Sequence, residues 1–246
     1  MTAKSAKSSK DTSRLGGVDA LVAVFRMRGA PEDLASYNAS VLKSAAEQAF
    51  AALKRHKPGE CIISIQDGPQ FVHDGKPLSV ITVVNDNMPF LFDSVSGEIA
   101  EHTGEPTLVL HPVMDVRHDG TGVCEIHDDG QSHAAGKDWP RVSLIHIHVP
   151  KLAEAVKEKL RERLEIVLWQ VRRSVTDWKP MLARLYQAIE NFSRPGLPLA
   201  KPALDEAVAF LRWLRDDNFI FLGMREFIYA GGTRDGALEP SGKEGL

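Results

Sequence analysis

The sequence is poor in cysteine, with only Cys61 and Cys124 among its 246 residues. A small secreted domain usually carries several cysteines at framework spacing, so this content favours a reducing compartment. The first 17 residues are rich in Lys, Ser and Thr and lack the apolar core of a signal peptide. No apolar run approaches the roughly 18 residues of a membrane span. We therefore expect a cytoplasmic protein without a membrane partner.

The sequence also lacks an excess of charge and the common nucleotide-binding and catalytic motifs. Its formal net charge of −3 gives no reason to expect a nucleic-acid partner. It has no G-x-G-x-x-G pattern opening a helix after a strand, as dinucleotide-binding folds require, and no P-loop, H-E-x-x-H or G-x-S-x-G pattern. We therefore predict no catalytic residues and no bound cofactor in this chain.

The apolar pattern in the middle of the chain changes between strand-like and helix-like periods. It predicts strand, helix, strand, strand and helix in that order, at 79–84, 89–102, 107–117, 141–149 and 151–175. These are five of the six elements of a ferredoxin-like βαββαβ unit, so the predicted fold class is α+β. Pro112 falls in the second strand, and a proline inside a strand fits only an edge strand or a bulge. In this topology the second strand lies at the sheet edge, where a proline is tolerated.

The flanking sequence completes the predicted division of the chain. We expect a disordered tail, an α+β domain with an additional N-terminal helix and C-terminal helices, a linker, and the start of a second, truncated module: 1–17, 18–192, 193–202 and 203–246. The N-terminal helix is predicted to start at Pro31 and to stop before Pro58. Thr176–Pro180 is predicted to interrupt the helical pattern, and 219–229 is predicted to be a strand.

Several stretches resemble one known family. The run V-V-N-D-N-M-P-F-L-F-D-S-V at 83–95 is followed by H-P-V at 111–113 and H-I-H-V at 146–149. F-L-R-W-L at 210–214 and F-I-F-L-G-M-R-E at 219–226 come later. Together they resemble the N-terminal region of the large bacterial NAD-specific glutamate dehydrogenases.

The resemblance implies a far longer polypeptide with ACT-like regulatory modules near its N-terminus and an NAD-dependent catalytic domain elsewhere. The chain would then be a non-catalytic regulatory and assembly region of an enzyme that deaminates L-glutamate oxidatively to 2-oxoglutarate. NAD would serve the full-length enzyme, and the implied partners are the rest of the polypeptide, an amino-acid effector and further copies in a homo-oligomer. The alternative is a free-standing ACT-like amino-acid sensor or protein-interaction module.

The loop after the first core strand is the candidate effector site. It leads to a helix predicted to start at Pro89 with Asn87 or Met88 as its cap, where free N–H groups and the helix dipole favour a carboxylate. The resemblance implies that amino acids bind at this loop, so the candidate contacts are Asn85, Asp86, Asn87 and Met88. Ordinary turn chemistry also explains an Asn-Asp-Asn sequence.

Three histidines form a candidate metal site. His146 and His148 share one face of a predicted strand, and strict alternation places His111 on the same face of a neighbouring strand. Three imidazoles within ligand reach could hold zinc or nickel, and a metal-dependent enzyme built on them is a third hypothesis. The alternative is three hydrogen-bonded histidines on the sheet.

Overall fold

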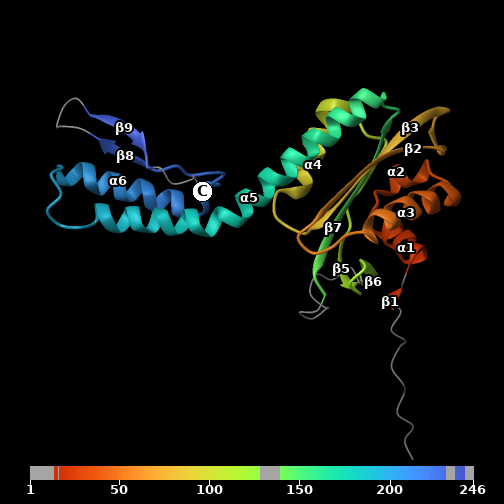
Figure 1. Cartoon of the computed structure of the whole chain (residues 1–246), viewed down its shortest axis with the longest axis horizontal. Coiled ribbons are helices and arrows are strands. Elements are labelled where there is room, and N and C mark those ends of the chain that lie inside the picture. The colour runs from red at the N-terminus through yellow and green to blue at the C-terminus, as the bar shows by residue number, and fades with distance from the viewer. Residues whose placement is uncertain (1–13, 16, 128–138, 231–235, 242–246) are drawn as a thin grey trace, which may run out of the picture. The chain divides into compact units, whose positions relative to one another are not determined.

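The computed structural model of the chain describes residues 14–15, 17–127, 139–230 and 236–241, and contains two compact units, residues 1–169 and 170–246 (Figure 1). Most of the predicted tail at 1–17 lies outside the described residues, although Arg14–Leu15 forms the short strand β1. The boundary between the units falls within helix α5, Glu154–Phe192. Each unit is described separately below.

An antiparallel sheet with β3 and β7 at its centre forms the framework of the first unit. The strand order is β1-β6-β5-β7-β3-β2, and β4 also pairs with β7. The other strands are β2 (Cys61–His73), β3 (Lys76–Asp86), β4 (Leu108–Leu110), β5 (Val113–His118), β6 (Val123–His127) and β7 (Arg141–Pro150). Val83 pairs with Ile145 across the central strands, where nearly every side chain is buried. Such continuous apolar strands are typical of a sheet that is covered on both faces.

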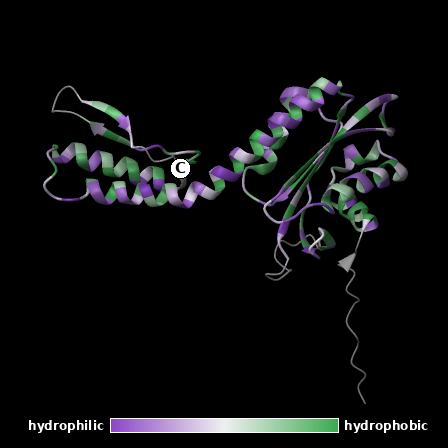
Figure 2. Ribbon diagram, in the orientation of Figure 1, coloured by the Kyte–Doolittle hydropathy of each residue, from purple (hydrophilic) through white to green (hydrophobic). Residues whose placement is uncertain are grey.

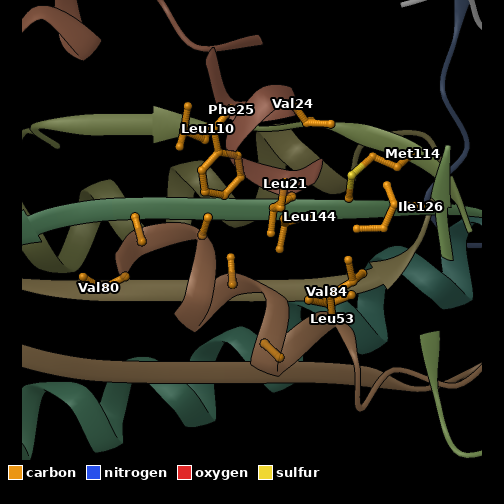
Figure 3. Packing of buried hydrophobic residues seen from close by; sticks show 14 of the residues in the cluster. Leu21, Val24, Phe25, Leu53, Val80, Val84, Leu110, Met114, Ile126 and Leu144 are labelled. Atoms are coloured by element: carbon orange, nitrogen blue, oxygen red, sulfur yellow. The ribbon is translucent and has the colours of Figure 1, made fainter. Parts of the chain in front are cut away.

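Helices lie on both faces of this sheet (Figure 1). One face carries α1 (Val18–Arg28), α2 (Pro31–Ala35) and α3 (Ala39–Leu53), and the other carries α4 (Leu91–Thr103) and the start of α5. Under the first group, Leu21 and Phe25 of α1 pack with Leu110, Leu144 and Val84 of the strands (Figure 3). This packing makes α1–α3 an integral layer of the unit.

The predicted α+β class and the order of the five core elements are confirmed, as β3, α4, β4 with β5, β7 and α5. The two central strands are the expected ones, and the preceding strand β2 lies next to β3. The predicted strand at 107–117 is broken between β4 and β5 at His111 and Pro112. The expectation that this strand lies wholly at an edge is wrong, because β5 pairs with β6 as well as β7.

The predicted N-terminal helix is two helices. The chain leaves the helical conformation after Ala35, and Asn38 then caps α3 by accepting a hydrogen bond from the Val41 amide at 3.0 Å. An Asn side chain at the N-cap satisfies an amide that has no partner inside the helix. Tyr37 lies in this short break, and its hydroxyl group takes part in the site described below.

The second unit contains the rest of α5, helix α6 (Lys201–Trp213), a π-helical turn at Leu214–Asn218, and a hairpin of β8 (Phe227–Ala230) and β9 (Ala237–Pro240). The predicted interruption at Thr176–Pro180 is wrong, because α5 continues through Pro180. Polar and apolar residues alternate along α5 (Figure 2). Its apolar residues are buried both before Pro180, at Val171, and after it, at Met181 and Leu185, so this packing outweighs the loss of one N–H. No helix in the described ranges combines the length and apolar character needed to cross a membrane.

Candidate functional site

The loop predicted to bind an effector begins at the end of β3, where Asn85 is buried. The Asn85 side-chain amide donates to the backbone oxygen of Asp86 at 3.2 Å and lies 3.9 Å from the sulfur of Met88. The Asp86 carboxylate accepts a hydrogen bond from the Gly59 amide at 2.7 Å. The Asn87 amide donates to the Arg141 carbonyl at 2.9 Å, while its side chain is exposed. Asn85 and Asp86 therefore shape the loop, and Asn87 presents its amide group to solvent.

Helix α4 starts two residues later than predicted, at Leu91. The residue before it is Phe90, with φ of 66° and an exposed ring, and no side chain caps the helix. The predicted cap at Asn87 or Met88 is wrong, because the left-handed turn at Phe90 separates these residues from the first helical turn. The first amides of α4 thus lack a side-chain acceptor, which is the state that favours an anionic group.

A buried histidine lies behind Asp86. His56 follows α3, its side chain is fully buried, and its Nε2 atom lies 3.5 Å from Asp86 Oδ1. Neither ring nitrogen makes a hydrogen bond within the described residues. Burial lowers the pKa of His56, and the Asp86 carboxylate acts in the opposite direction. No local sequence pattern marks this pair, because α3 and β3 are brought together only by the fold.

His146 and His148 form a buried pair beneath the helices α1–α3. The two Nε2 atoms lie 3.1 Å apart, and both side chains are fully buried. The other ring nitrogens contact hydroxyl groups: His146 Nδ1 lies 2.9 Å from Thr82 Oγ1, and His148 Nδ1 lies 3.1 Å from the Tyr37 hydroxyl. Tyr37 in turn lies 3.1 Å from Thr107 Oγ1. The pair therefore belongs to a continuous hydrogen-bonded chain.

The donor and acceptor roles along this series of hydrogen bonds follow from Thr107, its last member. Thr107 Oγ1 donates to the His148 backbone oxygen at 3.3 Å, so it accepts from Tyr37, and Tyr37 accepts from His148 Nδ1. His148 Nε2 is then an acceptor for His146 Nε2–H, and Thr82 donates to His146 Nδ1. His146, His148, Tyr37 and Thr107 each serve once as donor and once as acceptor, with both imidazoles neutral. Burial lowers the pKa of His148 to about 3 and that of His146 well below its ordinary value, which agrees with this assignment.

His111 is not near this pair, so the prediction that the three histidines share one face is wrong. His111 Nε2 lies 2.9 Å from Ser143 Oγ, and its ring stacks on Phe92 of α4 at 4.3 Å. Ser143 and His146 differ by three positions on β7, so they point to opposite faces of the sheet. The break at Pro112 removes the alternation on which the prediction relied. The three histidines therefore do not form one metal site.

A different set of side chains lies close enough together to coordinate a metal ion. One ligand atom each from Glu98, Glu101 and His102 lie within 4.8 Å of one another. Arg163 of α5 already forms two hydrogen bonds with the Glu98 carboxylate, at 2.8 and 3.1 Å, and holds the pKa of Glu98 below its usual value. The guanidinium thus supplies the positive charge that a cation would bring, and it fixes α5 to α4.

Comparison with known proteins agrees with the resemblance seen in the sequence. Residues 21–164 match the model of the family described as "Glutamate dehydrogenase, ACT1 domain". The chain belongs to this family. The matched range runs from α1 into α5, so it includes the effector-loop candidates, the buried histidine pair and the Glu98–Arg163 contact.

Curated relatives of this chain are named NAD-specific glutamate dehydrogenase. The chain is 28% identical to the Pseudomonas aeruginosa protein over 161 residues, which is 65% of this chain and 10% of that protein. It is 29% identical to the Halomonas elongata protein over 226 residues, 90% of this chain and 14% of that protein. It is 28% identical to the Mycobacterium tuberculosis protein over 213 residues, which is 85% of this chain and 12% of that protein. The chain therefore spans a tenth to a seventh of the length of these relatives.

Proposed function

We propose that the chain is the non-catalytic N-terminal regulatory and assembly region of a large, cytoplasmic NAD-specific glutamate dehydrogenase. The family match at 21–164 carries the proposal, because it places the chain in a domain family of glutamate dehydrogenases. The names of the relatives support it, since the chain matches only a small part of each. The full-length enzyme would oxidise L-glutamate to 2-oxoglutarate with NAD bound elsewhere in the polypeptide.

The fold of the first unit is proposed to be ACT-like, a variant of the ferredoxin-like βαββαβ unit. The two central strands β3 and β7, with β4 and β5 beyond β7 and with α4 and α5 on one face, support this assignment. In this variant β2 takes the place next to β3 that the sixth element would otherwise fill. The extra layer α1–α3 covers the opposite face of the sheet.

The effector of the proposed regulation is an amino acid bound at the loop 85–88. The uncapped start of α4 would receive the carboxylate, and the exposed Asn87 side chain would hydrogen-bond to the ligand. Asp86 is held by Gly59, so it would position the loop. Regulation requires that the effector bind one arrangement of the loop and α4 more tightly than another, because only differential affinity shifts an equilibrium.

A thermal-shift and calorimetric screen of amino acids against the 246-residue chain tests this proposal. A true effector at tenfold excess over its Kd should add more than about 1 kcal/mol to the free energy of unfolding. Asn87→Ala should weaken that effect. Asn191 is also an exposed asparagine but lies far along the sequence, on α5, so Asn191→Ala should leave the effect unchanged. If no amino acid adds more than about 0.5 kcal/mol at saturation, the loop is a structural turn.

A further inference from the structure

The second unit buries too few apolar side chains to account for its own stability. Within its described residues the buried apolar side chains are Val171, Met181, Leu185, Ile189 and Val208. Three of them, Leu185, Ile189 and Val208, form the cluster between α5 and α6. Units of this size need a much larger core, a disulfide, a metal or a partner to be stable. The deficit indicates that other polypeptide completes the unit.

The hairpin β8–β9 exposes large apolar side chains on both of its faces. Phe227 and Ile228 are consecutive on β8, so they point to opposite sides, and they are 50% and 58% exposed. Leu238 on β9 is 69% exposed. Within the described residues β8 pairs only with β9, and a two-stranded hairpin alone is marginally stable in water. Among the residues that the structure describes, nothing further pairs with the edges of the hairpin, and large apolar side chains on both of its faces are half exposed or more.

Helix α6 has a second apolar face that the cluster does not use. Val208 packs in the cluster with α5, whereas Phe210 and Trp213 stack on each other with ring centroids 6.1 Å apart. These two side chains are 56% and 50% exposed. Their spacing of three residues places them on one side of the helix. A stacked aromatic pair on the surface is the composition that protein interfaces favour at their centres.

The relatives indicate which polypeptide covers these side chains. The match to the Halomonas elongata protein covers 226 residues, so it extends well beyond residue 169 into the second unit, yet it is only 14% of that protein. In such a protein most of the polypeptide is covalently linked to this unit. A linked segment acts at a local concentration in the millimolar range, which favours it over a second copy of the chain.

We propose that the hairpin β8–β9 and the Phe210–Trp213 pair are a docking surface for another part of the same full-length polypeptide, outside these 246 residues. The docking segment is apolar and adds at least one strand to an edge of the hairpin, as in other cases of strand addition. This inference rests on the proposed function, since it needs a larger enzyme. The second unit would then connect the ACT1 region to the rest of that enzyme.

Hydrogen–deuterium exchange on the 246-residue chain and on the full-length enzyme tests the docking surface. Amides of β8 and β9 should exchange at least about tenfold more slowly in the full-length enzyme, while those of β3 and β7 should exchange equally in both. Fast exchange of the hairpin in the full-length enzyme would overturn the proposal. So would protection in the 246-residue chain itself, either as a monomer or as a dimer that forms with rising concentration.

A single substitution separates docking from hairpin stability. Ile228 lies directly opposite Glu239, so Ile228→Lys creates an opposite-charge pair across the hairpin and should preserve it. The same lysine would place a charge in the docked interface, so the protection of β8 in the full-length enzyme should be lost. Ala183→Lys, at an exposed position of α5, adds the same charge as a control and should leave the protection intact.

An activity assay keeps the two proposals separate. Glutamate-dependent reduction of NAD by the full-length enzyme reports on the proposed function. Enzyme that oxidises glutamate but leaves the hairpin unprotected would refute docking alone. A protected hairpin in a protein that does not act on glutamate would refute the proposed function and leave an intramolecular docking surface. Protection that survives Ile228→Lys would also contradict the assigned surface.

Discussion

The Nε2 atoms of His146 and His148 lie 3.1 Å apart inside the first unit, and only one of them can carry the proton between them. Each remaining ring nitrogen contacts a hydroxyl group, from Thr82 or from Tyr37. Tyr37 lies in the break between α2 and α3, so the hydrogen-bonded chain fixes the helical layer to the centre of the sheet. This arrangement depends on neutral imidazoles, and its sensitivity to pH and to loss of one hydroxyl can be measured.

We expect the free energy of unfolding to fall as pH drops below about 6.5. Burial holds the pKa of His148 at about 3 and that of His146 well below its ordinary value, whereas both titrate normally when unfolded. The unfolded chain therefore binds more protons in this window, and each histidine removes about 1.4 kcal/mol per pH unit. Urea unfolding at about pH 7 and about pH 5 measures the slope. His148→Gln should make the slope shallower, and an unchanged slope would contradict a neutral His148.

Tyr37→Phe should lower the free energy of unfolding by about 1–3 kcal/mol. The substitution keeps the ring and leaves His148 Nδ1–H without its acceptor in a buried position. Burial also raises the pKa of the Tyr37 hydroxyl, as expected for a group whose neutral form takes part in the chain. Tyr186→Phe provides the control because Tyr186 is 51% exposed. Equal midpoints of chemical unfolding for both variants would show that the hydrogen bonds from His148 through Tyr37 to Thr107 contribute nothing to stability.

Phe90→Asn should raise the free energy of unfolding by about 0.5–1 kcal/mol. Phe90 has φ of 66°, a conformation that an asparagine adopts at lower cost, and its ring is 45% exposed. Phe92→Asn is the contrasting variant. It removes the ring that stacks on His111, so it should lower the free energy of unfolding. If the two variants change the melting temperature in the same direction, backbone strain at Phe90 does not determine the effect of Phe90→Asn on stability.

Gly122→Ala should be strongly destabilising, by at least about 2 kcal/mol. A Cβ atom at Gly122 would overlap the backbone oxygen of Lys54, which lies just after α3 and cannot move independently of it. Gly97→Ala is the matched substitution inside α4, where nothing lies within 4 Å of the added atom. It should raise stability by about 0.5–1 kcal/mol, since alanine favours helix. Circular dichroism melts of both variants give the comparison, and a tolerated Gly122→Ala would contradict the close packing.

Local sequence patterns were sufficient to predict the central strands and the presence of α4 and α5 on one face of the sheet. The β-branched run of β3 and the apolar alternation of β7 are present in the sequence itself, so they were recognised together with their order. The sequence pattern predicts an edge strand at Pro112, and it does not predict that the strand breaks there and that the side-chain direction changes. His111 changed face because the alternation does not continue across a broken strand.

The rest of the site depends on contacts between distant segments. His56 meets Asp86 only because α3 packs against β3, and neither sequence neighbourhood marks a polar pair. The buried chain through Tyr37 required the short break after α2, whose cap at Asn38 is a local signal that could have been used. The start of α4 was misplaced because the left-handed turn at Phe90 is unusual for an aromatic residue.

The position of β2 beside β3 has a consequence for the time course of folding. Its partner in the sheet is the next strand along the chain, so edge strand β2 and inner strand β3 can pair as soon as residue 86 has left the ribosome. β7 must wait for about sixty further residues before it can join β3. A β2–β3 hairpin that forms early offers β7 a preformed edge during synthesis, so the cost of ordering β3 is no longer added to the loop-closure entropy of this non-local pairing.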